Sequence, residues 1–185
     1  MVCGKLQGYN QWAKRYAAEK EIPQHKEWLR EMLRQADEEK IALNYQLNGL
    51  MDIFDSLRYG SKKLCKALRE EGKDIFNYYL DARPEETLEA FRKAEKEGRL
   101  FGLQILAQRV KKERTGKKKR SVEKHISAEG AISLFSFAQD KEKEVREALV
   151  EALDKAEVFE EDVIGLLASS RAADRETAVK VLVKW

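Results

Sequence analysis

The sequence contains few prolines, cysteines and histidines, with two of each in 185 residues. Cys3 and Cys65 lie far apart, which indicates two free thiols in a reducing compartment rather than a disulfide framework. The N-terminus lacks the apolar core of a signal peptide, and no apolar run approaches the ~20 residues that cross a bilayer. We therefore expect a soluble, cytoplasmic protein without a membrane-spanning segment.

Metal and catalytic motifs are also scarce. His25 and His125 each lack a second metal ligand at i+3 or i+4, which excludes the His-Glu-x-x-His zinc pattern and the paired Glu-x-x-His di-iron pattern. Glu21 precedes His25 by one helical turn, but Pro23 between them is expected to disrupt a shared face, and both histidines are expected at the surface. Cys65 lies on an apolar helical face, which favours a core thiol over a nucleophile. We predict no catalytic, metal-binding or cofactor-binding residues, and an enzyme is the less favoured interpretation.

What the sequence does contain is charge and helical periodicity. Of its residues 37% are charged and 43% are hydrophobic, and few runs of alternating β-branched residues occur. This composition predicts an all-α chain with solvated helix faces and a core that needs no disulfides. The N-terminal half is expected to be irregular, with helix boundaries at Gly60 and Gly72.

The best-defined helical pattern lies in residues 127–185. Apolar residues recur there at the spacing of one helical face: Val145, Ala148, Leu149, Ala152, Leu153 and Ala156. Asp140 is expected to cap this helix. A similar helix follows about 30 residues later, capped by Asp174, with Ala178 and Val179 in the places of Ala148 and Leu149.

Four residues form the pattern D-(x)4-V-R-x-A: Asp140, Val145, Arg146 and Ala148. A looser copy consists of Asp174, Ala178 and Val179. In these residues the chain resembles the HEAT and armadillo-like repeat families. The resemblance implies a right-handed stack of antiparallel helical hairpins, an α-solenoid of about ten helices, that acts as a non-enzymatic scaffold for a protein partner. Because the second copy lacks the Val-Arg pair, two ordinary hairpins of a helical bundle remain the alternative.

The expected organisation has four regions. An irregular helical region covers 1–83, a helical hairpin 84–113, a basic loop 114–126 and HEAT-like hairpins 127–185. The last helix is expected to run to Trp185 without a stop signal, so it continues into further sequence, docks on a partner, or folds back on the preceding hairpin. The residues expected to face a partner are Lys143, Arg146, Lys180 and Trp185, with Glu147 and Lys184 as further exposed positions.

Positive charge is concentrated between residues 109 and 120. Eight cations accompany a single acid, Glu113, in this stretch: Arg109, Lys111, Lys112, Arg114, Lys117, Lys118, Lys119 and Arg120. They are suited to neutralise nucleic-acid phosphates or to bind an acidic protein, although no base-stacking aromatic and no recognition motif accompanies them. An import signal and a solvated loop between helices are the other interpretations. Nucleic-acid binding is therefore the alternative to the scaffold.

Overall fold

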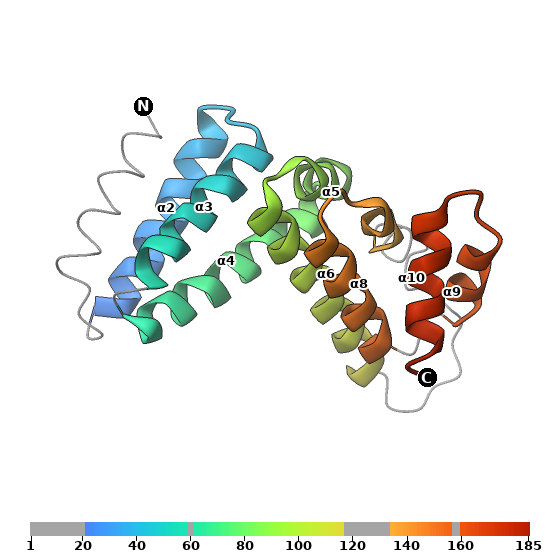
Figure 1. Ribbon diagram of the computed structural model, residues 1–185. Helices are drawn as coiled ribbons and strands as arrows, with labels where there is room; N and C mark the ends of the chain where they lie inside the picture. The colour runs from blue at the N-terminus through green and yellow to red at the C-terminus, as the bar shows by residue number, and fades with distance from the viewer. Residues whose placement is uncertain (1–20, 59–60, 117–133, 157–159) are drawn as a thin grey trace. The chain divides into compact units, whose positions relative to one another are not determined.

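The structure is a computed structural model that describes residues 21–58, 61–116, 134–156 and 160–185. Within these ranges the secondary structure is helical and no strand occurs, which confirms the predicted all-α class (Figure 1). The chain divides into two compact units, Met1–Gly98 and Arg99–Trp185. This division falls inside the hairpin predicted over 84–113.

The first unit contains the helices α2 (Ile22–Glu38), α3 (Leu43–Arg58), α4 (Lys62–Ala82) and α5 (Pro84–Lys93). α4 packs against α2, α3 and α5, and α3 also packs against α2 and α5. The fully buried side chains come from all four helices: Leu29, Leu33, Leu47, Leu50, Phe54, Leu64, Leu68, Phe76 and Phe91. The Phe76 ring lies 5.8 Å from Phe91 and 5.5 Å from Tyr79, measured between ring centroids. The core of this unit is therefore apolar and partly aromatic.

Local chemistry explains where these helices begin. Pro23 and Pro84 stand in the first turns of α2 and α5, where the fixed φ of proline suits the helix and no N–H is needed. At the start of α4 the Ser61 hydroxyl accepts a hydrogen bond from the Leu64 N–H at 3.2 Å. The interruption expected at Gly72 is wrong, because α4 runs through this buried residue. Packing on both sides outweighs the ~1 kcal/mol by which glycine disfavours a helix.

The second unit contains most of α6 (Lys96–Gly116), followed by the 3-10 helix η2 (Ser136–Gln139), α8 (Lys143–Ala156), α9 (Glu160–Leu167) and α10 (Ala172–Leu182). α10 packs against α8, α9 and η2. Residues 134–156 and 160–185 share a buried apolar core. Its side chains are Leu134, Phe137, Ala138, Val145, Leu149, Val150, Leu153, Val163, Ala178 and Val181.

The C-terminal residues form a turn rather than a continuation of α10. The helix ends at Leu182, and the Lys184 N–H donates to the Val181 carbonyl oxygen at 3.0 Å. This bond spans three residues instead of four, which tightens the last turn and ends the helix. The expectation that the helix runs to Trp185 is therefore wrong.

Candidate interaction surface

Asp140 and Arg146, two residues of the predicted motif, close the turn that leads into α8. The Asp140 carboxylate accepts the Glu142 N–H at 2.9 Å. It also accepts two bonds from the Arg99 guanidinium, Nε to Oδ2 at 2.6 Å and Nη2 to Oδ1 at 3.1 Å. Arg146 Nη1 donates to the carbonyl oxygens of Asp140 at 2.6 Å and of Lys141 at 3.1 Å. The motif therefore stabilises a turn.

The turn that leads into α10 is held in a similar way by different residues. Arg175 Nη1 donates to the Ser169 carbonyl oxygen at 2.7 Å, six residues earlier, and the Arg146 bond to Asp140 spans the same number of residues. The Ser169 hydroxyl accepts the Arg171 N–H at 3.2 Å. Ser169 therefore takes the place that Asp140 has in the first turn.

The predicted capping role of Asp174 is wrong. The N-cap of α10 is Arg171, and Asp174 lies within the first helical turn, where its charge favours the positive end of the helix dipole. Its buried Oδ2 accepts bonds from the Ser169 hydroxyl at 2.6 Å and from the Gln139 amide at 3.3 Å. Arg171 Nη1 also donates to the Gln139 side-chain oxygen. These bonds link the start of α10 to η2.

The two arginine bonds give an alignment of η2–α8 with α9–α10 that is based on hydrogen bonds. With Arg146 equivalent to Arg175, Leu149 corresponds to Ala178, and both side chains are fully buried. The alignment expected from the sequence paired Leu149 with Val179, which is exposed. It is wrong by one residue. Because successive helical residues point about 100° apart, an error of one residue exchanges a core position for a surface position.

The pair α9–α10 exposes several apolar side chains. They lie on both helices and in the following turn: Ile164, Leu167, Val179, Val183 and Trp185. These five residues are termed the end surface. Large apolar side chains exposed together on a helical face are typical of interaction sites, because burial against a partner removes them from water.

In the preceding pair the equivalent positions are covered. Ala138, which corresponds to Leu167, is 0% exposed, and Val150, which corresponds to Val179, is 5% exposed. Leu167 and Val179 are 39% and 50% exposed. α10 packs against both elements of the first pair, η2 and α8. Among the helices that the structure describes, none covers the second pair in this way.

The residues expected to face a partner fall into two groups. Lys143, Lys180 and Trp185 are exposed, and each lysine forms an ion pair with a glutamate on its own helix. Arg146 is half-buried and holds the turn before α8. Lys184 is exposed and reaches Glu151 on α8, with Nζ and Oε1 2.8 Å apart. Of the four residues predicted to face a partner, only Trp185 belongs to the end surface. The other members of that surface were not predicted from the sequence.

The basic segment is described only in its first part. α6 extends through Gly116, so four of the eight cations lie on this helix: Arg109, Lys111, Lys112 and Arg114. The other four lie outside the described residues: Lys117, Lys118, Lys119 and Arg120. The same is true of residues 117–126 of the predicted basic loop.

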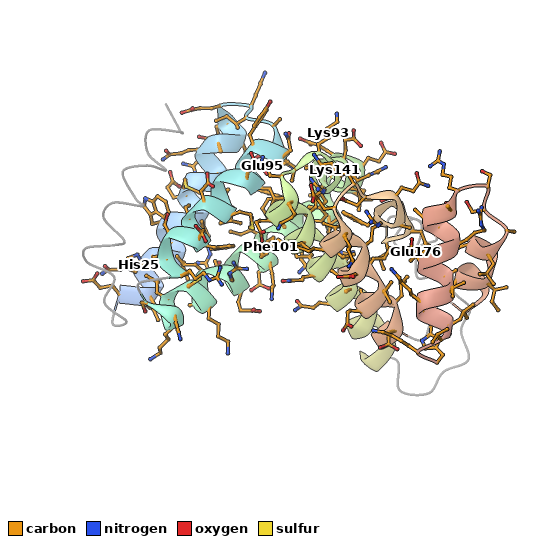
Figure 2. All side chains as sticks on the ribbon, in the orientation of Figure 1. His25, Lys93, Glu95, Phe101, Lys141 and Glu176 are labelled. Carbon is orange, nitrogen blue, oxygen red and sulfur yellow. The ribbon has the colours of Figure 1, made fainter. Side chains whose placement is uncertain are left out.

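The surface position expected for His25 is wrong. Its side chain is 1% exposed in the first turn of α2, and Nε2 lies 3.9 Å from the Glu21 carboxylate (Figure 2). Pro23 extends the helix at this position instead of disrupting it, so Glu21 and His25 share a face. Burial lowers the pKa of His25, although Glu21 acts in the opposite direction. The imidazole is therefore neutral at pH 7.

A partly buried polar cluster joins α2 to the junction between α4 and α5. Arg83 Nη2 lies 2.7 Å from each carboxylate oxygen of Asp37, and the Gln46 amide donates to Oδ1 at 2.9 Å. Burial raises the pKa of Asp37, but the bonds from Arg83 and Gln46 outweigh it and lower the pKa overall. Burial and the Asp37 carboxylate raise the pKa of Tyr79 to about 12. At neutral pH these groups therefore act as hydrogen-bond partners of one another rather than as acid and base.

Cys65 is buried, as expected for a core thiol, and its Sγ lies 3.5 Å from the Phe54 carbonyl oxygen. In the described ranges no three His, Cys, Asp or Glu side chains are placed to hold a metal ion. None of the helices described has the length and the apolar character that crossing a membrane requires. Comparisons with protein-family models, with curated proteins and with solved structures found no match to this chain.

Proposed function

We propose that this chain is a non-enzymatic helical scaffold that binds a protein partner through the end surface. The observation that carries the proposal is the exposure of Leu167 and Val179 at positions where the preceding helix pair has the buried Ala138 and Val150. Exposing apolar area of this kind is unfavourable by roughly 25 cal/mol per Å² relative to burying it. A partner that covers this surface recovers that free energy.

A HEAT-like stacking of hairpins in residues 134–185 is part of the same proposal. Two features support it: the arginine that binds a carbonyl oxygen six residues earlier in each turn, and the packing of α10 against both η2 and α8. In an α-solenoid each repeat contacts only its neighbours, and the outermost repeat needs a covering element. On this proposal the partner is the element that covers α9 and α10.

The partner is sought by affinity capture with the full chain and two variants. Val179→Asp places a charge on the end surface, while Tyr45→Asp places one on α3, where the side chain is also exposed. At least one protein is expected to bind the unmodified chain and Tyr45→Asp but not Val179→Asp, and to bind again when both proteins are purified. Identical captured proteins for all three chains would contradict the proposal. Circular dichroism of both variants checks that they fold.

Nucleic-acid binding by residues 109–120 is a second candidate function. The continuation of α6 through Gly116 favours it, because four of the eight cations of this segment then belong to one helix. Contacts to about five to seven phosphates give a slope of about −5 to −6 for log affinity against log salt concentration. Light scattering with a mixed-sequence oligonucleotide across a salt series tests this. A monomer whose mass does not change when the oligonucleotide is added at low salt eliminates the function. A complex lost at moderate salt and on neutralising Lys117 to Arg120 establishes it.

A further inference from the structure

The contact of α10 with α8 shows which side chains accompany the apolar face of a covering helix. Glu176 lies on α10 and is labelled in Figure 2. Its pKa is lowered, first by the hydrogen bond from Lys180, then by the charge of Lys180, and least by the positive charges of Arg146 and Lys143 on α8. The helix that packs against α8 thus carries a carboxylate on which the positive charges of α8 act.

The equivalent arginine of the second pair is exposed to solvent. Arg175 corresponds to Arg146 and is exposed, and Nη1 donates to the Ser169 carbonyl oxygen. Exposed residues follow each other at i+4 spacing along this side of α10: Arg171, Arg175, Val179 and Val183. Residues four positions apart lie on one helical face. The stripe is thus cationic at its start and apolar at its end.

We infer that the end surface binds an amphipathic helix whose apolar stripe is flanked by acidic residues. The apolar part of that helix covers Leu167 and Val179, and its carboxylates meet the guanidinium groups of Arg171 and Arg175. Arginine favours carboxylate partners because its planar group forms paired, charge-assisted hydrogen bonds. This inference rests on the proposed function and specifies the class of partner.

A second copy of this chain is a poorer occupant. In a two-fold dimer both copies contribute the same surface, so each copy brings the same two exposed arginines, Arg171 and Arg175, to the interface. The exposed acid on α10, Glu176, already binds Lys180 of its own helix, with Oε1 and Nζ 2.6 Å apart. Like charges brought together across an interface oppose association. The charge of this surface therefore favours a different helix that carries carboxylates.

The test uses the full chain and two synthetic helical peptides that share one apolar stripe. Glutamates flank the stripe in the acidic peptide, and lysines occupy the same positions in the basic peptide. Fluorescence anisotropy of the labelled peptides at low salt is expected to show at least about tenfold tighter binding of the acidic peptide. Raising the salt concentration is expected to reduce this difference, because exposed charges are screened.

Variants locate the binding on the end surface. Val179→Asp is expected to abolish binding of the acidic peptide, and Tyr45→Asp is expected to leave it unchanged. Arg175→Gln is expected to reduce the preference for the acidic peptide. Because Arg175 also holds the turn before α10, the second charge variant is Arg171→Gln, which leaves that turn bond in place and removes the bond from Arg171 to Gln139 instead. Circular dichroism confirms that each variant keeps its helix content.

Three results would overturn the inference: equal affinity for both peptides, no binding of the acidic peptide, or unchanged binding to Val179→Asp. A dimer seen by light scattering without peptide, and lost in Val179→Asp, would assign the surface to a second copy and overturn it as well. The affinity capture described above separates this failure from that of the proposed function. If a captured partner depends on Val179 but the peptides show no acidic preference, the proposed function stands and only this inference fails. If binding does not depend on Val179 in either assay, both the inference and the proposed function fail.

Discussion

Arg99 and Asp140 form a buried ion pair whose side chains are each 7% exposed. Two bonds join the guanidinium to the carboxylate, which also accepts the Glu142 N–H, so both of its oxygens are hydrogen-bonded. A buried pair of this kind contributes little net stability compared with apolar side chains of the same size. Removing one partner is different, because the remaining charge is left buried without compensation.

Arg99→Met is expected to lower the free energy of unfolding by about 3–5 kcal/mol, since it leaves the Asp140 carboxylate buried and uncompensated. Urea denaturation followed by circular dichroism measures the change. The double variant Arg99→Met with Asp140→Asn is the control, because asparagine keeps an acceptor for the Glu142 N–H and carries no charge. It is expected to recover part of the loss. Equal destabilisation of the single and double variants would show that the charge is not the cause.

His25 is expected to make the stability of the protein depend on pH. Burial lowers the pKa of His25 from its ordinary value of 6.5, so below pH 6.5 the unfolded chain binds this proton more readily than the folded one. The free energy of unfolding therefore decreases as the pH falls from 7.5 to about 5.5. His25→Gln is expected to flatten this slope in urea denaturation at both pH values. A slope of the same size in the variant would assign it to another group.

Asp37 and Glu71 affect stability at lower pH. The pKa of each is lowered because hydrogen bonds, from Arg83 and Gln46 to Asp37 and from Arg30 and Lys26 to Glu71, outweigh the effect of burial. Their stabilisation is fully present above the pKa of an unfolded carboxyl group and is lost as the pH falls through the lowered folded values. It therefore fades below about pH 4 and does not interfere with the range in which His25 titrates.

Two helical glycines differ in what surrounds them. A Cβ at Gly98, in the first turn of α6, would lie 2.7 Å from the Ala94 Cβ, 3.2 Å from Leu47 Cγ and 3.3 Å from Asn48 Oδ1. The Asn48 oxygen accepts the Glu95 N–H at 2.9 Å and is not free to move away. At Gly165 in α9 no such atom lies within 4 Å. Close packing requires glycine at the first position and does not require it at the second.

Gly98→Ala is expected to destabilise the protein by about 1–3 kcal/mol through overpacking. Gly165→Ala is the matched variant and is expected to stabilise it by up to ~1 kcal/mol, because alanine is the better helix former and has fewer unfolded conformations to lose. Thermal unfolding followed by circular dichroism compares the two. Shifts of the midpoint in the same direction for both variants would contradict this account.

The two compact units each have a buried apolar core, which allows them to open separately. Local and sub-global opening follows such packed units, and amide hydrogen exchange reports it segment by segment. Leu50 in α3 and Leu149 in α8 are both fully buried, one in each unit. They form a matched pair of sites for testing this independence.

Leu50→Ala is expected to remove about 2–5 kcal/mol of stability by leaving a cavity, and to increase hydrogen exchange in α2 to α5 more than in α8 to α10. Leu149→Ala is expected to produce the reverse pattern. Mass spectrometry of the exchanged peptides measures both. A uniform loss of protection over the whole chain in either variant would show that the two units unfold as one.

Short-range features of the fold were predictable from neighbouring residues. Proline in the first turns of α2 and α5 and the Ser61 cap act within one turn of helix, so the sequence around them is sufficient. The apolar face of α8 was predictable for the same reason. The break expected at Gly72 was wrong because helix propensity is a weak preference that packing along the whole of α4 overrides.

The candidate site was only partly predictable. Asp140 and Arg146 stood out as a motif, but the equivalent turn uses Ser169 and Arg175, and no shared residue type at the first position reveals the correspondence. The predicted alignment was therefore wrong by one residue. It placed Val179, an exposed member of the end surface, at the position of the buried Leu149. In each pair the arginine lies six residues after the residue whose carbonyl oxygen it binds. Aligning Arg146 with Arg175 gives the pairing of Leu149 with Ala178.

The sequence alone determined that this protein is helical, where several helices begin and which face of α8 is apolar, because these properties depend on residues within one or two turns of each other. Tertiary structure decided which of those faces are covered. The Arg99–Asp140 pair joins residues 41 positions apart. His25 is buried only when the first unit is folded, and the exposure of Leu167 and Val179 depends on what packs against α9 and α10. Contacts between distant residues have no local pattern, so only the folded chain reveals them.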